Sequence, residues 1–199
     1  MTTNTRFTQK ILTGAVALAI VAFAASARAE AVDQYVTILK VNGHARYSIS
    51  GKMNDWKECK KGDVLRPGTL FQTAEDGNVD VIFGERVPVA TTPMGAGAPS
   101  ARALSYNPDK GPKANIVHIF PSSVLVVDKL TFEKTGMDDV SETQLDLRAG
   151  QIMGNVKKLN GASRYEVKIP NGVAGIRGTT YIIRGDGQVL VFSGSVVVS

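Results

Sequence analysis

The sequence predicts an all-β protein built from many short strands joined by tight glycine turns. Three observations predict it: turn dipeptides that contain glycine, apolar residues that alternate along the chain, and no sustained helical period after residue 30. Glycine makes up 20 of the 199 residues, above the usual share of about 7%. Such strands pack as a β-sandwich or as a solenoid-like roll, and the sequence leaves both architectures open.

The turns are marked by dipeptides of Asn or Asp followed by Gly, residue types that tolerate the positive φ of tight hairpins. Five occur: Asn42-Gly43, Asp76-Gly77, Asn160-Gly161, Asn171-Gly172 and Asp186-Gly187. Their spacing divides the chain into segments of strand length, which argues for many short strands in one domain.

The strands themselves follow from alternation and from β-branched residues. Val79, Val81 and Phe83 fall on one face of a strand while Asn78 and Asp80 fall on the other, and the segment Tyr165 to Ile169 repeats the pattern. Runs rich in β-branched residues predict further strands at 35–41, 116–120, 124–127, 179–183, 189–192 and 196–198. Ser193-Gly194-Ser195 is interpreted as the turn between the last two. One short helical turn is predicted at 137–143.

Residues 1–29 have the layout of a secretory signal peptide. A basic start with Arg6 and Lys10 precedes an uncharged apolar run at 11–25 and the small-residue site Ala27-Arg28-Ala29. The run of 15 residues falls short of the roughly 20 that a membrane-spanning helix needs. We expect cleavage near Ala29 and a periplasmic or secreted product without a permanent membrane span. An uncleaved anchor is the alternative interpretation.

Composition bounds the mature part to one domain at 30–199. Removing 29 of 199 residues leaves 170, enough for a proper core, and takes three basic side chains with it, so the formal charge falls from +5 to +2. That balance gives no support for a nucleic-acid partner. Cys59 has no second cysteine to pair with and is either a buried thiol or an intermolecular bridge. The Pro/Gly-rich segment 87–114 is predicted to be an inserted loop.

The residues that catalysis or metal binding requires are nearly missing. His44 and His118 stand alone, without a histidine or cysteine at metal-ligand spacing, and no nucleophile elbow occurs. Asp138, Asp139 and Glu142 lack the spacing of a calcium loop and are interpreted as solvated loop carboxylates. We therefore predict no enzyme, no catalytic or metal-binding residue and no cofactor.

A basic cluster surrounds the single tryptophan. Trp56 is flanked by Lys52, Lys57, Lys60 and Lys61, and acidic residues at 55, 58 and 63 interleave with them. Local neutralisation is the more economical interpretation, and a patch for an anionic polymer is the alternative. Arg184-Gly185-Asp186-Gly187 contains an adhesion tripeptide but fits a hairpin turn better.

The carboxyl-terminal half contains four sequence motifs in succession. They are Leu145 to Ile152 with Gly150, Tyr165 to Pro170, Ala174-Gly175-Ile176-Arg177-Gly178-Thr179, and a last strand pair joined through Gly194. This succession resembles the FecR domain, and residues 35–84 resemble the first strands of that family. The resemblance covers roughly 35–84 and 115–198.

The resemblance implies mainly structural roles for the motif residues Gly150, Pro170, Ala174, Gly175, Ile176, Arg177, Gly178, Thr179 and Gly194. Gly175 and Gly178 suit a positive φ or a bulge, and Arg177 then needs either a carboxylate, for which Asp146 and Glu166 are the candidates, or several carbonyl groups. In the alternative interpretation Arg177 binds the carboxylate of a ligand.

The regulators of the FecR family carry a cytoplasmic sigma-binding domain, and we expect none here because ten residues precede the apolar run. The resemblance then implies a stand-alone, non-catalytic binding or signal-sensing module whose partner is another envelope protein or a cell-surface component. The alternative is a structural or surface-assembly protein that associates through strand edges, to which the run 196–198 is suited.

Overall fold

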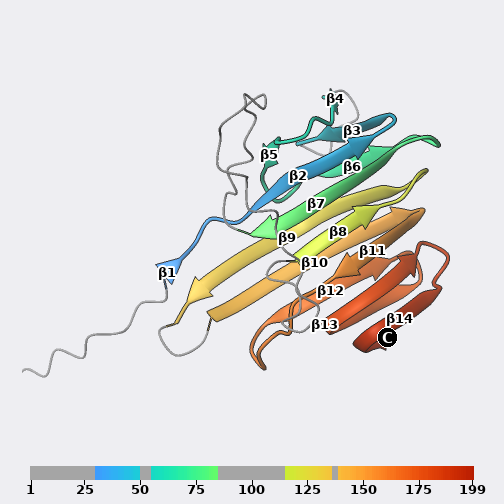
Figure 1. The fold of residues 1–199 in the computed structure, drawn as a ribbon. Coiled ribbons are helices and arrows are strands. Elements are labelled where there is room, and N and C mark those ends of the chain that lie inside the picture. The colour runs from blue at the N-terminus through green and yellow to red at the C-terminus, as the bar shows by residue number, and fades with distance from the viewer. Residues whose placement is uncertain (1–29, 50–54, 85–114, 136–138) are drawn as a thin grey trace, which may run out of the picture.

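The computed structural model describes residues 30–49, 55–84, 115–135 and 139–199 (Figure 1). The predicted signal peptide at 1–29 and the predicted loop at 87–114 lie outside these residues. Within the described ranges every regular element is a strand, which confirms the all-β prediction.

Fourteen strands form a single hydrogen-bonded sheet. They are β1 (Glu30–Ala31), β2 (Tyr35–Asn42), β3 (Ala45–Ser48), β4 (Lys57–Glu58), β5 (Val64–Leu65), β6 (Leu70–Thr73), β7 (Asn78–Gly84), β8 (Asn115–Ile119), β9 (Val124–Lys134), β10 (Asp139–Ala149), β11 (Gln151–Asn155), β12 (Arg164–Ile169), β13 (Gly172–Arg184) and β14 (Val189–Val198). All five predicted turn dipeptides lie at connections between consecutive strands, although Asn42 ends β2 and Gly172 begins β13.

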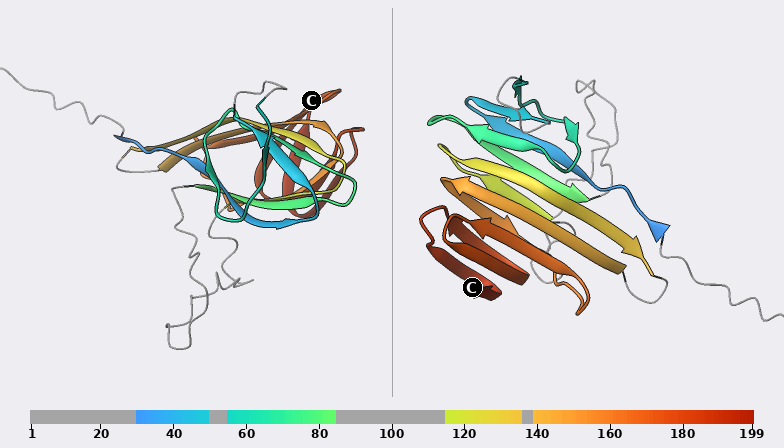
Figure 2. Two further views of the ribbon diagram at one scale, coloured as in Figure 1. Left: turned by 90° about the horizontal axis from the view of Figure 1, so that it is seen from above. Right: turned by 180° about the vertical axis from the view of Figure 1, so that it is seen from behind.

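The sheet curls on itself as a roll. Its strand order is β4, β3, β6, β9, β10, β12, β13, β11, β8, β7, β2, β5, with β1 added to β9 and β14 added to β13. Seen from above, the sheet curves so that the two faces of the roll lie opposite each other around a shared interior (Figure 2). Because one continuous sheet forms both faces, the roll is the observed architecture, not a sandwich of two sheets.

Strand β13 carries the sheet from one face of the roll to the other. Its first part, Gly172 to Gly175, pairs with β12, and its second part, Thr180 to Arg184, pairs with β11. The opposite edge of β13 pairs with β14 along both parts. A bulge between Arg177 and Thr180 separates the two parts, so that the strand bends where it changes neighbours.

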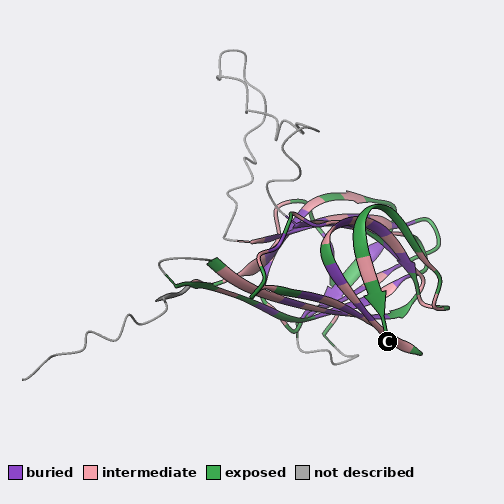
Figure 3. Ribbon diagram, turned by 90° about the horizontal axis from the view of Figure 1, so that it is seen from below, coloured by how far each residue is buried: buried purple, intermediate pink, exposed green. Residues whose placement is uncertain are grey.

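The core fills the roll between its two faces. Alternate residues of each strand point inward, as with Leu145 and Leu147 of β10, which are fully buried. The largest fully buried side chains are Tyr165, Tyr181, Phe71, Ile38, Ile119 and Leu125. Figure 3 shows buried residues distributed along most strands of the roll, whereas the strand that leads to the C-terminus, β14, is largely exposed.

Two local predictions are wrong. The predicted helical turn at 137–143 overlaps β10, which begins at Asp139 and pairs with β9 from its first residue. Cross-strand pairing and the burial of Thr143 override the weak local preference. The predicted strands 189–192 and 196–198 are one strand, β14, because Ser193-Gly194-Ser195 forms a bulge and not a turn.

Candidate binding surfaces

A cleft of about 490 Å³ lies at the β4 end of the roll. We call it the Trp56 cleft; its lining comes from β3, β4, β6 and adjoining loop residues, namely His44, Ala45, Arg46, Trp56, Lys57, Glu58, Gln72, Thr73 and Ala74. Strand β3 pairs with β4 on one edge and with β6 on the other, so three separate segments of the chain meet here.

Arg46 is the central side chain of the Trp56 cleft. Its neighbours Ala45 and Tyr47 are buried, so the alternation of β3 directs Arg46 outward. The guanidinium carbon lies 4.3 Å from the centroid of the Trp56 ring, and Nε and Nη2 donate to Gln72 Oε1 at 3.0 and 2.8 Å. Cation–π stacking of this kind contributes roughly 0.5–1 kcal/mol at an exposed site and holds the guanidinium in place.

Several hydrogen-bond donors of the cleft have no partner among the described residues. Arg46 keeps its Nη1 group uncommitted, and neither the Lys57 ammonium nor the Trp56 indole N–H is bonded there. The predicted local neutralisation does not take the form of ion pairs, because Lys57, Lys60 and Lys61 make none within the ranges that the structure describes. Arg46 and Lys57 against Glu58 leave one net positive charge on the lining.

A histidine and an aspartate form the rim of the cleft. His44 Nδ1 lies 2.7 Å from Asp76 Oδ2, and both side chains are exposed. The hydrogen bond to Asp76, followed by the charge of that carboxylate, raises the pKa of His44 above 6.5. The same hydrogen bond lowers the pKa of Asp76 below 3.8. The other histidine, His118, bonds its cross-strand neighbour Asp80 on the outer face of β7 and β8.

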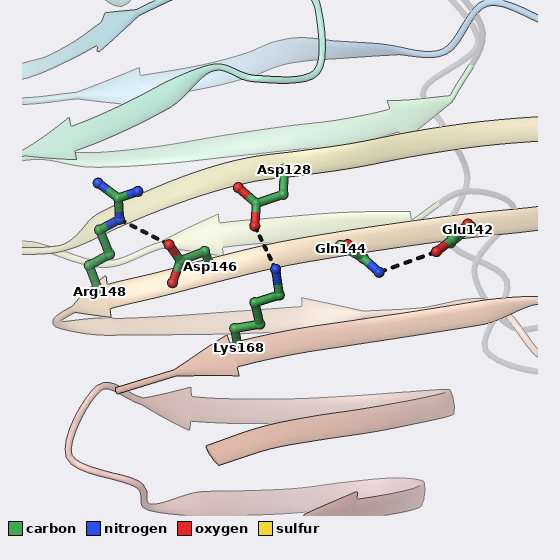
Figure 4. Close-up of polar contacts among 6 residues, drawn as sticks. All are labelled: Asp128, Glu142, Gln144, Asp146, Arg148 and Lys168. Atoms are coloured by element: carbon green, nitrogen blue, oxygen red, sulfur yellow. Dashed lines mark hydrogen bonds and ion pairs between the residues drawn. The ribbon is translucent and has the colours of Figure 1, made fainter. Parts of the chain in front are cut away.

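The outer face of β9, β10 and β12 is also charged, but its charges satisfy one another (Figure 4). Lys168 Nζ lies 3.1 Å from Asp128, Lys129 Nζ lies 2.5 Å from Glu142, and Arg148 Nε lies 2.9 Å from Asp146. Glu142 is therefore a paired strand residue and not the solvated loop carboxylate that was predicted. A face on which cations and anions are already paired offers little to a charged ligand.

Arg177 has none of its predicted partners. It is exposed on β13, while Asp146 pairs with Arg148 and Glu166 pairs with Arg164 at 3.5 Å. No ion pair joins Arg177 to a residue that the structure describes. The prediction of an internal carboxylate partner is wrong because the side chain points away from the core and water solvates it.

The other motif residues have structural positions. Ala174 and Ile176 are buried on the inner face of β13, Pro170 begins the turn between β12 and β13, and Gly150 joins β10 to β11. Gly175 lies in the regular part of β13, without a positive φ.

Gly178 and Gly194 form matched bulges in β13 and β14. Their φ angles are 63° and 89°, and a Cβ on Gly194 would lie 2.3 Å from the Gly178 carbonyl oxygen. The buried Thr179 hydroxyl donates to the Ser195 carbonyl at 2.8 Å and fixes the two bulges side by side. The motif thus shapes the corner of the roll.

Strand β14 is the exposed edge at the opposite end of the roll from the Trp56 cleft (Figures 1 and 2). It pairs with β13 alone among the described strands. Phe192, Val197 and Val198 are 63%, 73% and 53% exposed, so large apolar side chains and an unpaired backbone edge coincide.

Neither a metal centre nor a reactive thiol appears in the part of the chain that the structure describes. No group of three or more His, Cys, Asp or Glu side chains that could hold a metal ion occurs there. Cys59 is a buried free thiol, and burial raises its pKa to about 12. The described ranges also contain no helix with the length and apolarity to cross a membrane.

Comparison with known families gives a match in the carboxyl-terminal part of the chain. Residues 115–197 match the model of the family described as FecR protein. The match runs from β8 into β14, so the front half that contains the Trp56 cleft lies outside it. Comparison with curated proteins and with solved structures finds no match. The FecR family is regulatory and non-enzymatic. Residues 115–197 of the chain are therefore similar to the FecR family.

Proposed function

We propose that this protein is an exported, non-catalytic binding module of a bacterial cell envelope that holds a carboxylate-bearing surface component in the Trp56 cleft. The FecR domain supports a role in sensing or regulation, and the signal-peptide layout of residues 1–29 supports export. The observation that carries the proposal is the set of uncommitted donors around Trp56.

The contrast with the rest of the surface points to a ligand. On the outer face of β9, β10 and β12 the cations lie against carboxylates, whereas Arg46 is held by a neutral amide and an aromatic ring. Gln72 and Trp56 therefore orient the guanidinium without neutralising it. An oriented guanidinium binds a carboxylate with charge-assisted hydrogen bonds, and the Lys57 ammonium lies on the same lining.

An acidic glycan or a peptide with free carboxylates fits this cleft best. Aromatic rings in binding sites contact the apolar faces of ligands, while a few placed polar groups fix their orientation. The net positive charge of the lining favours an anionic ligand over a neutral polymer. The modest charge of the mature part gives no support for nucleic acid.

Retention on solubilised peptidoglycan, a carboxylate-bearing envelope polymer, tests the proposal. We expect the wild-type protein to be retained and Arg46→Met to lose most of that retention with an unchanged melting temperature. Arg148→Met is the matched control, because Arg148 is also exposed but lies on the paired face. Equal retention of Arg46→Met and Arg148→Met would refute the cleft as the binding site.

The alternative function is structural assembly through strand edges, and the exposed edge of β14 favours it. That edge lies at the other end of the roll, so the two functions can be separated by variants at each end.

A further inference from the structure

The outer edge of β14 pairs with no described strand, and within the described ranges it lacks the devices that usually protect an edge strand. Natural proteins protect such edges with lysines, prolines, short strands or covering segments. Strand β14 is ten residues long, and no charged residue or proline occurs from 187 to 199. The nearest charges, Arg184 and Asp186, pair with each other at 3.3 Å in the preceding turn.

The opposite end of the same sheet is protected. The terminal strands there are β4 and β5, each two residues long, and both residues of β4 are charged. So short an edge offers too few backbone groups to accept a ten-residue strand. Addition of β14 to the far end of another copy is therefore unfavourable, and an open chain of copies does not grow.

The pattern of β14 is complementary to itself in the antiparallel sense. Two apolar segments, 189–192 and 196–198, lie on either side of the bulge at Gly194. Register with β13 places Val189, Val191, Val196 and Val198 on the inner side of the sheet and Leu190 and Val197 on the outer side, while Phe192 lies at a register shift without a partner in β13. Antiparallel pairing that sets Val191 opposite Val196 and Leu190 opposite Val197 of the second copy brings apolar residues together on both sides of the sheet, without like charges in opposition.

We propose that β14 pairs antiparallel with β14 of a second copy and forms a closed two-fold dimer. The two sheets become one continuous sheet, the unpaired backbone groups of both edges are satisfied, and the exposed side chain of Val197 gains an apolar cross-strand neighbour. The dimer presents its two Trp56 clefts at opposite ends, which suits a polymeric ligand with repeated binding groups. This inference does not depend on what the cleft binds.

Sedimentation of the purified protein over a range of concentrations tests the dimer. We expect the mass of two chains for the wild type and of one chain for Val197→Lys, with the same melting temperature at low concentration. Ile49→Lys is the matched control, because Ile49 is 44% exposed near the other end of the roll, and it should remain dimeric. A monomeric wild type, steady growth beyond two chains, or a dimeric Val197→Lys would overturn the proposal.

Cross-linking distinguishes the antiparallel arrangement from a parallel one. Ser193→Cys lies beside the proposed two-fold axis and should form an intermolecular disulfide under mild oxidation, while Leu190→Cys lies away from the axis and should not. Cross-linking of both variants would indicate parallel pairing and contradict the proposal, and so would the failure of Ser193→Cys to cross-link. The native Cys59 is buried and does not interfere.

Discussion

The hydroxyl of Tyr181 donates a hydrogen bond to the hydroxyl of Tyr165 at 3.3 Å within the core of the roll. Both side chains are buried, and the rings meet edge to face with centroids 6.4 Å apart. Burial raises the pKa of both hydroxyls, so the pair stays neutral and each hydroxyl depends on the other for its partner.

We predict that Tyr181→Phe lowers the free energy of unfolding by about 1–3 kcal/mol, because it leaves the Tyr165 hydroxyl buried without a partner. The double variant Tyr165→Phe with Tyr181→Phe removes both hydroxyls and should recover most of that loss. Urea denaturation of the two single variants and the double variant measures the three free energies of unfolding. A double variant as unstable as the sum of the single ones would show that the hydroxyls do not act as a pair.

The bulge at Gly178 yields a second prediction. At φ 63°, with Lys158 Cα 2.8 Å from the position of a Cβ, Gly178→Val should destabilise the fold by about 1–3 kcal/mol. Gly175→Val is the control, since Gly175 has no positive φ and the nearest atom to its Cβ position lies 3.7 Å away. Thermal melting of both variants decides it, and equal melting temperatures would contradict the strained bulge.

Because Arg177 is exposed, we expect its removal to have little effect on the free energy of unfolding. Arg177→Met should alter the free energy of unfolding by less than about 0.5 kcal/mol, because no described carboxylate loses a partner. Chemical denaturation beside the wild type checks this. A loss of several kcal/mol would mean that the guanidinium has a structural partner after all.

The histidine at the rim of the cleft titrates with its aspartate. We expect the pKa of His44 above 6.5 in the folded protein and a fall toward 6.5 in Asp76→Asn, because Asp76 stabilises the charged imidazolium. A raised pKa in the folded state means that this contribution is present at low pH and is lost as the pH rises through it. NMR titration of the His44 ring measures both values, and an unchanged pKa in Asp76→Asn would contradict the pairing.

The sequence was sufficient to predict the class of the fold because the turns and the alternation are local signals. Asn42-Gly43 and Asp186-Gly187 mark turns whose glycines do have positive φ, and the alternation in 79–83 and 165–169 places the core residues correctly. The sequence could not decide between the sandwich and the roll, since the roll depends on β13 exchanging neighbours at a bulge.

The Trp56 cleft could not be predicted from the sequence either. Arg46, Trp56 and Gln72 come from separate segments, and only the pairing of β3 with β6 brings the guanidinium to the amide. The basic residues around Trp56 were a visible signal, but whether neighbouring carboxylates neutralise them is a matter of side-chain distance. Likewise, Ser193-Gly194-Ser195 has the composition of a turn, and only the matching bulge at Gly178 makes it part of a strand.

The fluorescence of Trp56 tests the central claim most directly, because it is the single tryptophan of the chain and lies in the proposed binding cleft. Titration with soluble peptidoglycan fragments should change the Trp56 emission saturably in the wild type and in Arg148→Met. The same titration of Arg46→Met should show a weaker or absent response. An emission that stays constant while the protein binds the fragments, or a response that is identical in Arg46→Met, would contradict binding at this cleft.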